Sequence, residues 1–250
     1  MPCFTLLLRL TLARVLLEIK KPKNSYIVPM NKSELLKELH EFLNPTRIQR
    51  FEEVLANRTR HFTVAVENIF QSHNASAVIR TCDCFGIQDL HVISNSNEYK
   101  PSKDVAMGAE KWVDLHSYYQ KENNTQDCID KLRKQGYQIV ATTPHSNDVM
   151  LPDFDVSQKS AFFFGTEISG LSDLVLEQAD SFVRIPMYGF TESYNISVSA
   201  ALVLHDVVTR LKKSEVNWML SEDELQDKRI DWAVKSLKSG PQILKQLLSK

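Results

Sequence analysis

Apolar positions between residues 62 and 213 follow two alternating periods, which predict strands interleaved with helices. Short runs rich in valine, isoleucine and phenylalanine mark strands, whereas apolar side chains three or four positions apart mark helices. The predicted strands are 62–69, 90–93, 112–119, 137–143, 161–165 and 181–187, and the predicted helices are 74–85, 125–135, 171–179 and 195–213. This alternation is typical of an α/β domain built on a parallel sheet.

Residues 30–60 carry a purely helical pattern. Asn31 and Glu34 have the spacing of a capping box, and the stripe behind them is apolar: Leu35, Leu36, Leu39, Phe42 and Leu43. A second helix is predicted to begin at Thr46, with Gln49 as its capping partner. Its side chains expected to face the core are Ile48, Phe51 and Leu55. The expected domains are therefore a helical arm at 30–60, an α/β domain at 61–213 and a helical appendage at 214–250.

Residues 1–29 contain an apolar stretch that Arg9, Arg14 and Glu18 interrupt. It is too short to span a bilayer, and it lacks the small-residue cleavage site of a signal peptide. The residues from Met30 onward have the pattern of a natural beginning. We therefore expect residues 1–29 to be an upstream extension outside the fold, with a membrane-surface helix as the alternative.

Composition narrows the function classes. A hydrophobic fraction of 43% and a charged fraction of 24% are ordinary for a globular protein. The formal net charge of −1 provides no global basic field, so an RNA site would have to be a local patch. The four cysteines show neither CxxC pairs nor zinc-ligand spacing, which predicts no metal, no disulfide framework and reduced thiols in the cytoplasm: Cys3, Cys82, Cys84 and Cys128.

Residues 73–86 predict a short helix with one unexpected charge. Val78, Ile79 and Cys82 would form its buried face, and Gly86 suits the left-handed position that ends a helix. Arg80 lies in the middle of this helix. A surface ion pair between Arg80 and Asp83, three residues further along the helix, would explain this charge without a function.

Two further loops follow predicted strands, where open α/β sheets bind ligands. In GTEISGLSD, residues 165–173, Glu167 lies between two glycines that allow close backbone approach. In IPMYGFTESYNISVSAA, residues 185–201, Ser193 and Asn195 precede the long helix, where both are also ordinary helix caps. GxGxxG, GxxxxGK[ST] and GxSxG motifs are absent from the sequence, which disfavours nicotinamide enzymes, NTPases and α/β-hydrolases.

These three segments, in this order, resemble the three motifs of the SpoU-type RNA 2′-O-ribose methyltransferases of the SPOUT superfamily. The resemblance covers residues 44–213 and is strongest to the family's TrmH branch, which methylates guanosine 18 of tRNA. It implies a parallel-sheet domain ending in a deep trefoil knot, a homodimer, S-adenosylmethionine as the methyl donor and tRNA as the substrate. It implies neither a metal nor a membrane.

The resemblance also assigns roles to residues. Arg80 matches the catalytic arginine, either as a general base or as a group that binds phosphate and stabilises alkoxide charge. The other positions matching the catalytic motifs, which would hold Arg80, the ribose-phosphate or the loops, are Asn74, Glu167, Ser193 and Asn195. The methyl donor would be held mainly by the backbone around Thr143, Gly165, Ile185, Met187 and Tyr194. Tyr194 replaces the family's usual leucine.

RNA contacts are predicted for six basic side chains: Arg47, Arg50, Arg58, Arg60, His73 and Arg210. A solvated face balanced by Glu52 and Glu53 is the alternative for the arm arginines. The long helix ends in TRLKK where the family has an arginine-rich run, which weakens the expectation for Arg210. Two other functions fit the same motifs: a 2′-O-methyltransferase acting on rRNA or another tRNA position, and a catalytically silent RNA-binding dimer.

Overall fold

The computed structural model describes residues 31–69, 71–95, 107–121, 123–144, 149–166 and 169–249. The described residues divide into two compact units, one that contains residues 31–56 and 220–249 and one that lies within Asn57–Met219. The predicted upstream extension at 1–29 and the candidate residue Glu167 lie outside the described residues.

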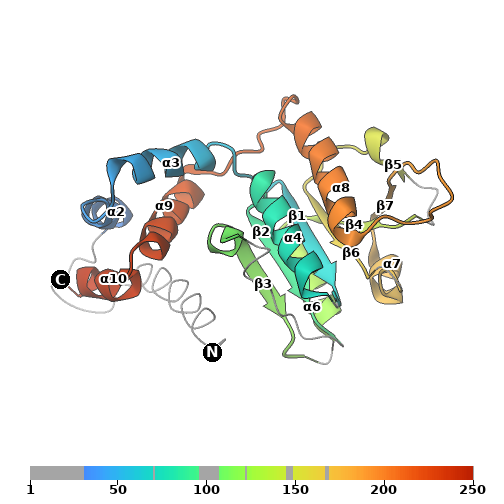
Figure 1. Cartoon of the computed structure of the whole chain (residues 1–250), viewed down its shortest axis with the longest axis horizontal. Helices are drawn as coiled ribbons and strands as arrows, with labels where there is room; N and C mark the ends of the chain where they lie inside the picture. The colour runs from blue at the N-terminus through green and yellow to red at the C-terminus, as the bar shows by residue number, and fades with distance from the viewer. Residues whose placement is uncertain are drawn as a thin grey trace. The chain divides into compact units, whose positions relative to one another are not determined.

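The larger unit is built on a parallel sheet of seven strands in the order β3-β2-β1-β6-β4-β7-β5 (Figure 1). Its strands are β1 Phe62–Glu67, β2 Asp89–Ile93, β3 Asp114–Tyr118, β4 Gln138–Thr142, β5 Val149–Met150, β6 Ser160–Phe164 and β7 Ser181–Arg184. All six predicted strands are confirmed. Strand β5 was not predicted, because two residues are too short to show a period.

Helices cover both faces of this sheet. Helices α4 (Ser72–Cys84) and α8 (Ile196–Leu211) lie side by side over one face, together with the short turns η1 (Ala109–Lys111) and η2 (Leu151–Asp153) (Figure 1). Helices α6 (Asn124–Lys134) and α7 (Asp173–Gln178) cover the other face. Successive strand residues feed alternate cores: Val64 and Phe162 pack under α4 and α8, and Phe163 packs under α6 and α7.

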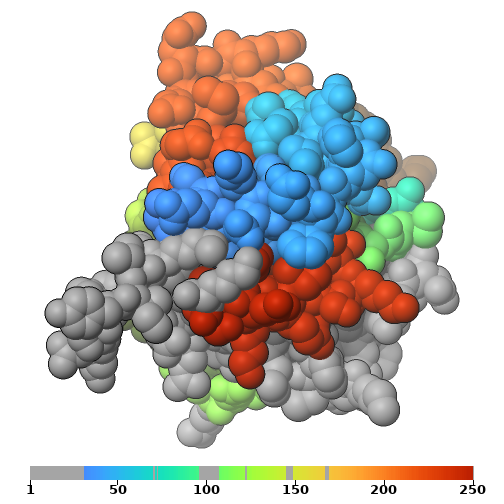
Figure 2. All heavy atoms as spheres, turned by 90° about the vertical axis from the view of Figure 1, so that its left-hand side faces the viewer, coloured from blue at the N-terminus to red at the C-terminus, as the bar shows by residue number. Residues whose placement is uncertain are grey.

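The described residues of the smaller unit form the helices α2 (Lys32–His40), α3 (Pro45–Leu55), α9 (Glu222–Ser236) and α10 (Gly240–Leu248). Figure 2 shows α2 and α3, in blue, against the red C-terminal helices. Their shared core contains Leu35, Leu39, Ile230, Val234 and Leu244. The sequence pattern predicts the arm and the appendage as two separate helical segments. In the structure each buries most of its apolar stripe against the other, but Phe42, which was predicted to belong to the stripe, is 54% exposed.

Helix starts lie within one or two residues of the predicted ones. The capping box of Asn31 and Glu34 is confirmed. However, α3 begins at Pro45 and not at Thr46, because the Asn44 side chain caps it by accepting the Thr46 N–H at 2.9 Å. Helix α4 begins at Ser72, which places Asn74 in its first turn and not at its cap.

Candidate functional site

The carboxyl ends of neighbouring strands bring several candidate residues to one edge of the sheet. Thr143, Gly165 and Ile185 directly follow β4, β6 and β7, and these strands are adjacent in the order β6-β4-β7. In open α/β sheets, ligands bind outside this edge. The loops predicted to hold the methyl donor therefore begin side by side.

Two of the predicted catalytic residues are in contact. The side-chain amide of Asn195 donates from Nδ2 to Oδ1 of Asn74 at 3.3 Å, although the two residues are 121 positions apart. Asn195 also caps α8, because its Oδ1 accepts the Ser197 N–H at 2.9 Å. Asn74 is only 3% exposed. Asn195 therefore caps α8 through Oδ1 and contacts Asn74 through Nδ2 of the same amide.

Arg80 projects from the outer side of α4. Its neighbours Val78 and Ile79 are fully buried, as predicted, while Arg80 itself is exposed. Within the part of the chain that the structure describes, no carboxylate pairs with Arg80. The sequence offered Asp83 as a surface ion-pair partner for Arg80, but Asp83 instead pairs with Arg58. The guanidinium of Arg80 thus remains available to a ligand.

The loop after β6 folds back on itself. Thr166 and Gly170 exchange two main-chain hydrogen bonds of 3.0 Å each, with Gly170 at φ +68°. A Cβ atom on Gly165 would lie 2.1 Å from the carbonyl of Gly170. Position 165 therefore requires glycine because the chain's own backbone at Gly170 packs against it, whereas the sequence suggested close approach to a ligand, which stays a prediction.

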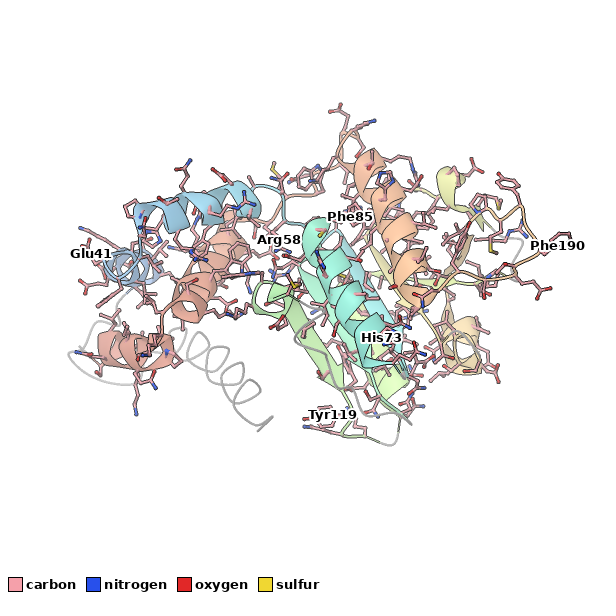
Figure 3. The ribbon with its side chains drawn as sticks, viewed as in Figure 1. Glu41, Arg58, His73, Phe85, Tyr119 and Phe190 are labelled. Carbon is pink, nitrogen blue, oxygen red and sulfur yellow. The ribbon has the colours of Figure 1, made fainter. Side chains whose placement is uncertain are left out.

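The loop between β7 and α8 presents main-chain groups and aromatic rings. Ile185 and Met187 are half-buried, and Ser193 is exposed. Tyr194 is partly exposed, and its hydroxyl donates to the Pro186 carbonyl at 3.4 Å. Among the described residues, the N–H groups of Met187 and Tyr194 donate to no main-chain oxygen. These N–H groups are suitable hydrogen-bond donors for a ligand. Figure 3 shows the Phe190 side chain projecting outward from the same loop.

Three of the predicted RNA-binding arginines are engaged within the fold. Arg58 is 1% exposed, pairs with Asp83 and donates to the Ile87 carbonyl at 3.3 Å, so the prediction that it contacts phosphate is wrong. Arg60 is half-buried and pairs with Asp89 at 2.7 Å and Asp114 at 3.0 Å. Burial acts to raise the pKa of Asp89, but the hydrogen bond from His116 and the charge of Arg60 hold it well below its usual range.

Arg210 likewise holds the fold together. It pairs with Asp206 at 2.6 Å and donates to the carbonyls of Phe154 at 2.6 Å and Leu151 at 3.0 Å. The guanidinium of Arg210 therefore anchors η2 to α8, and its predicted contact with RNA stays a prediction. The exposed basic candidates that remain are Arg47, Arg50 and His73, the last of which Figure 3 places at the start of α4.

One buried carboxylate at this edge of the sheet was not predicted from the sequence. Glu67 ends β1 at 2% exposure and accepts hydrogen bonds from Thr125 and Ser172. The available signal was a charged residue near the end of an otherwise apolar strand, FTVAVENI. It was missed because its partners are distant in sequence.

No group of His, Cys, Asp or Glu side chains in the described ranges could hold a metal ion. Burial raises the pKa of the Cys82 and Cys128 thiols, so neither is a nucleophile at neutral pH. Among the helices of the described residues, none is long and apolar enough to cross a membrane.

Comparison with known proteins decides the family. The model of the SpoU rRNA methylase family matches residues 61–205. The chain belongs to this family. A tRNA (guanosine(18)-2′-O)-methyltransferase of Borreliella burgdorferi is 42% identical over 194 residues, covering 78% of this chain and 87% of the relative. The Escherichia coli protein of the same name is 32% identical over 188 residues, covering 74% and 80%.

A solved structure shares the fold of this SpoU-family chain. The TrmH/SpoU tRNA modifying enzyme of Aquifex aeolicus aligns with a TM-score of 0.68 and 30% identity. The alignment covers 77% of this chain and 97% of the other.

Proposed function

We propose that this SpoU-family protein transfers a methyl group from S-adenosylmethionine to the ribose 2′ oxygen of guanosine 18 in tRNA, in the cytoplasm. The contact between Asn74 and Asn195 carries the proposal, because it joins the third motif to the first turn of α4, the helix that presents Arg80. The names of the relatives support guanosine 18 as the position. Bound S-adenosylmethionine would supply an electrophilic methyl carbon on a sulfonium.

Arg80 suits the stabilisation of negative charge on the attacking ribose oxygen. A guanidinium holds its proton far above neutral pH, so giving that proton up near neutral pH would be costly. Binding a substrate phosphate and the developing alkoxide requires no such loss. Arg80 is exposed on α4, a helix fixed by the burial of Val78 and Ile79. In this proposal Ser193 and Glu167 help to hold the RNA and the loops.

The donor would lie against the loops after β4, β6 and β7. The N–H groups of Met187 and Tyr194 fit an adenine held by main-chain hydrogen bonds, and the close packing of Gly165 on Gly170 shapes the neighbouring loop. Thr143 and Ile185 would complete this wall. The family resemblance supports a trefoil knot in this part of the chain.

Transfer of labelled methyl groups tests the enzyme proposal. Purified protein, labelled S-adenosylmethionine and EDTA are incubated with unmodified tRNA or, in parallel, with rRNA. We expect labelling of tRNA, undiminished by EDTA because the mechanism uses no metal. Label in rRNA alone would favour the rRNA enzyme, and no transfer to either RNA would favour the silent RNA-binding protein.

We also propose that the protein forms a homodimer through α8. Ile196, Ala200 and Val203 are already buried in the chain's own core, but Val198 is 43% and Leu202 is 38% exposed. These two side chains lie one turn apart on the helix, and a second copy would cover them.

Light scattering at micromolar concentration is expected to give twice the chain mass of 28.7 kDa. Leu202→Glu should shift the protein toward the monomer, because it would place a charge in the interface. Glu177→Gln on α7 is the control and should leave the mass unchanged. An active wild-type monomer would contradict the dimer.

The arm is proposed to bind tRNA phosphates through Arg47 and Arg50. Both side chains are exposed on α3, and the ion pair of Arg50 with Glu53 lies at the surface, where such pairs contribute little. Changing both arginines to alanine should weaken tRNA binding and reduce its salt slope by up to about two phosphate contacts. Affinity for the methyl donor should not change. A double variant with the wild-type salt slope would refute the contact.

A further inference from the structure

Glu67 is a buried carboxylate that accepts three hydrogen bonds. Its Oε1 accepts the hydroxyl of Thr125 at 2.6 Å and that of Ser172 at 2.8 Å, and its Oε2 accepts the Ser172 N–H at 2.8 Å. A carboxylate at this depth is costly to bury unless such bonds replace its water. Two elements remote in sequence from β1 supply them.

Both partners of Glu67 lie at helix starts. Ser172 caps α7, where its Oγ accepts the Val175 N–H at 3.4 Å, and Thr125 lies in the first turn of α6. The N-terminal end of a helix favours negative charge. No ion pair joins Glu67 to a cation within the described residues, so these hydrogen bonds and helix ends stabilise the carboxylate.

Strand β1 holds both ends of the loop at 165–172. At one end, β6 pairs with β1, with Val66 opposite Phe164 just before the loop begins. At the other end, Ser172 binds Glu67 through both its N–H and its hydroxyl. Between these ends, the mutual hydrogen bonds of Thr166 and Gly170 narrow the loop. Release of Ser172 would free one end of this loop.

We propose that Glu67 is a positioning residue that fixes Ser172, and through it the segment 169–172 that packs against Gly165, in the position that binds the methyl donor. This inference rests on the proposed function, which places the donor against Gly165. Glu67 acts through Ser172 and touches neither the donor nor the RNA in this proposal. A purely structural role would instead lower stability without a specific effect on donor affinity.

The test compares variants of the full chain by calorimetric binding of S-adenosylhomocysteine, together with melting temperature and tRNA affinity. Glu67→Gln keeps the size of the side chain but can turn an amide donor toward the Ser172 N–H. Ser172→Ala removes the hydroxyl donor, and Ser172→Thr retains it. The matched control is Thr63→Val on the same strand, which removes a buried hydroxyl that donates to the Asp89 carbonyl at 2.8 Å, away from the loop.

We expect Glu67→Gln and Ser172→Ala to weaken S-adenosylhomocysteine binding about tenfold, which corresponds to about 1.4 kcal/mol. Because Ser172→Thr keeps the hydroxyl donor, its affinity for S-adenosylhomocysteine should lie within about twofold of the wild-type value. Thr63→Val should lower only the melting temperature, and tRNA affinity should hold throughout. Should Glu67→Gln fail to fold, Ser172→Ala decides.

Wild-type donor affinity in Ser172→Ala, or an equal loss of affinity in Thr63→Val, would overturn the positioning role. A wild-type protein that binds S-adenosylhomocysteine but methylates no RNA would overturn the proposed function alone. The positioning role would then still be judged by the binding data.

Discussion

Arg80→Ala is expected to lower the turnover number for tRNA methylation about a thousandfold, the scale of removing a group that stabilises transition-state charge. The side chain is exposed, and within the described residues it pairs with no carboxylate, so its removal should leave the fold intact. Donor affinity should change little, because the proposed donor loops follow β4, β6 and β7 and not β1. Single-turnover kinetics with labelled donor, alongside donor binding, measure both quantities.

Two companion variants sharpen this result. Arg80→Lys keeps the charge but loses the planar, bidentate guanidinium, and it should recover only a small part of the rate. Arg133→Ala removes an arginine that pairs with Asp180 on the surface, and it should be nearly as active as wild type. A rate for Arg80→Ala close to that of Arg133→Ala would show that Arg80 has no part in catalysis.

Gly165→Ala is expected to weaken binding of S-adenosylhomocysteine by about a hundredfold, or 2.7 kcal/mol. The added Cβ would lie 2.1 Å from the carbonyl of Gly170, and backbone atoms at that distance must move. The displaced segment is the loop proposed to hold the donor. Calorimetry measures the affinity, and circular dichroism establishes that the sheet remains folded.

Gly136→Ala is the control for a glycine substitution as such. Gly136 lies between α6 and β4 at φ +81°, with no atom within 4 Å of an added Cβ. Alanine there should cost about 1 kcal/mol of stability through backbone strain alone. Donor binding should be close to wild type. Equal losses of affinity in the two variants would mean that the Gly165 effect is only general destabilisation.

Hydrophobic periodicity was sufficient to predict the sheet and its main helices. The strands around Val64, Val140 and Phe162 are mostly apolar and buried, as expected for a parallel sheet covered on both faces. The long helix and its cap at Asn195 were also predictable, since a polar cap precedes an apolar segment.

Pairings between distant residues could not be predicted from the pattern. Arg58 looks like part of a basic patch in the sequence, but the turn after α3 buries it against Asp83. Glu67 shows no sign of its bonds to Thr125 and Ser172, because those partners meet it only when α6 and α7 pack on the sheet. An apolar stripe on one side of a helix does not indicate which other helix will cover it. The core that the arm and the appendage share was therefore not predicted.

The most direct test of the proposed function is to map the methylated ribose at nucleotide resolution. Unmodified tRNA is incubated with the purified protein and S-adenosylmethionine, and a matched tRNA with 2′-deoxyguanosine at position 18 serves as the control. We expect a single 2′-O-methyl group at guanosine 18 and no product with the control tRNA. A methyl group at another ribose, or none in any tRNA, would contradict methylation of guanosine 18.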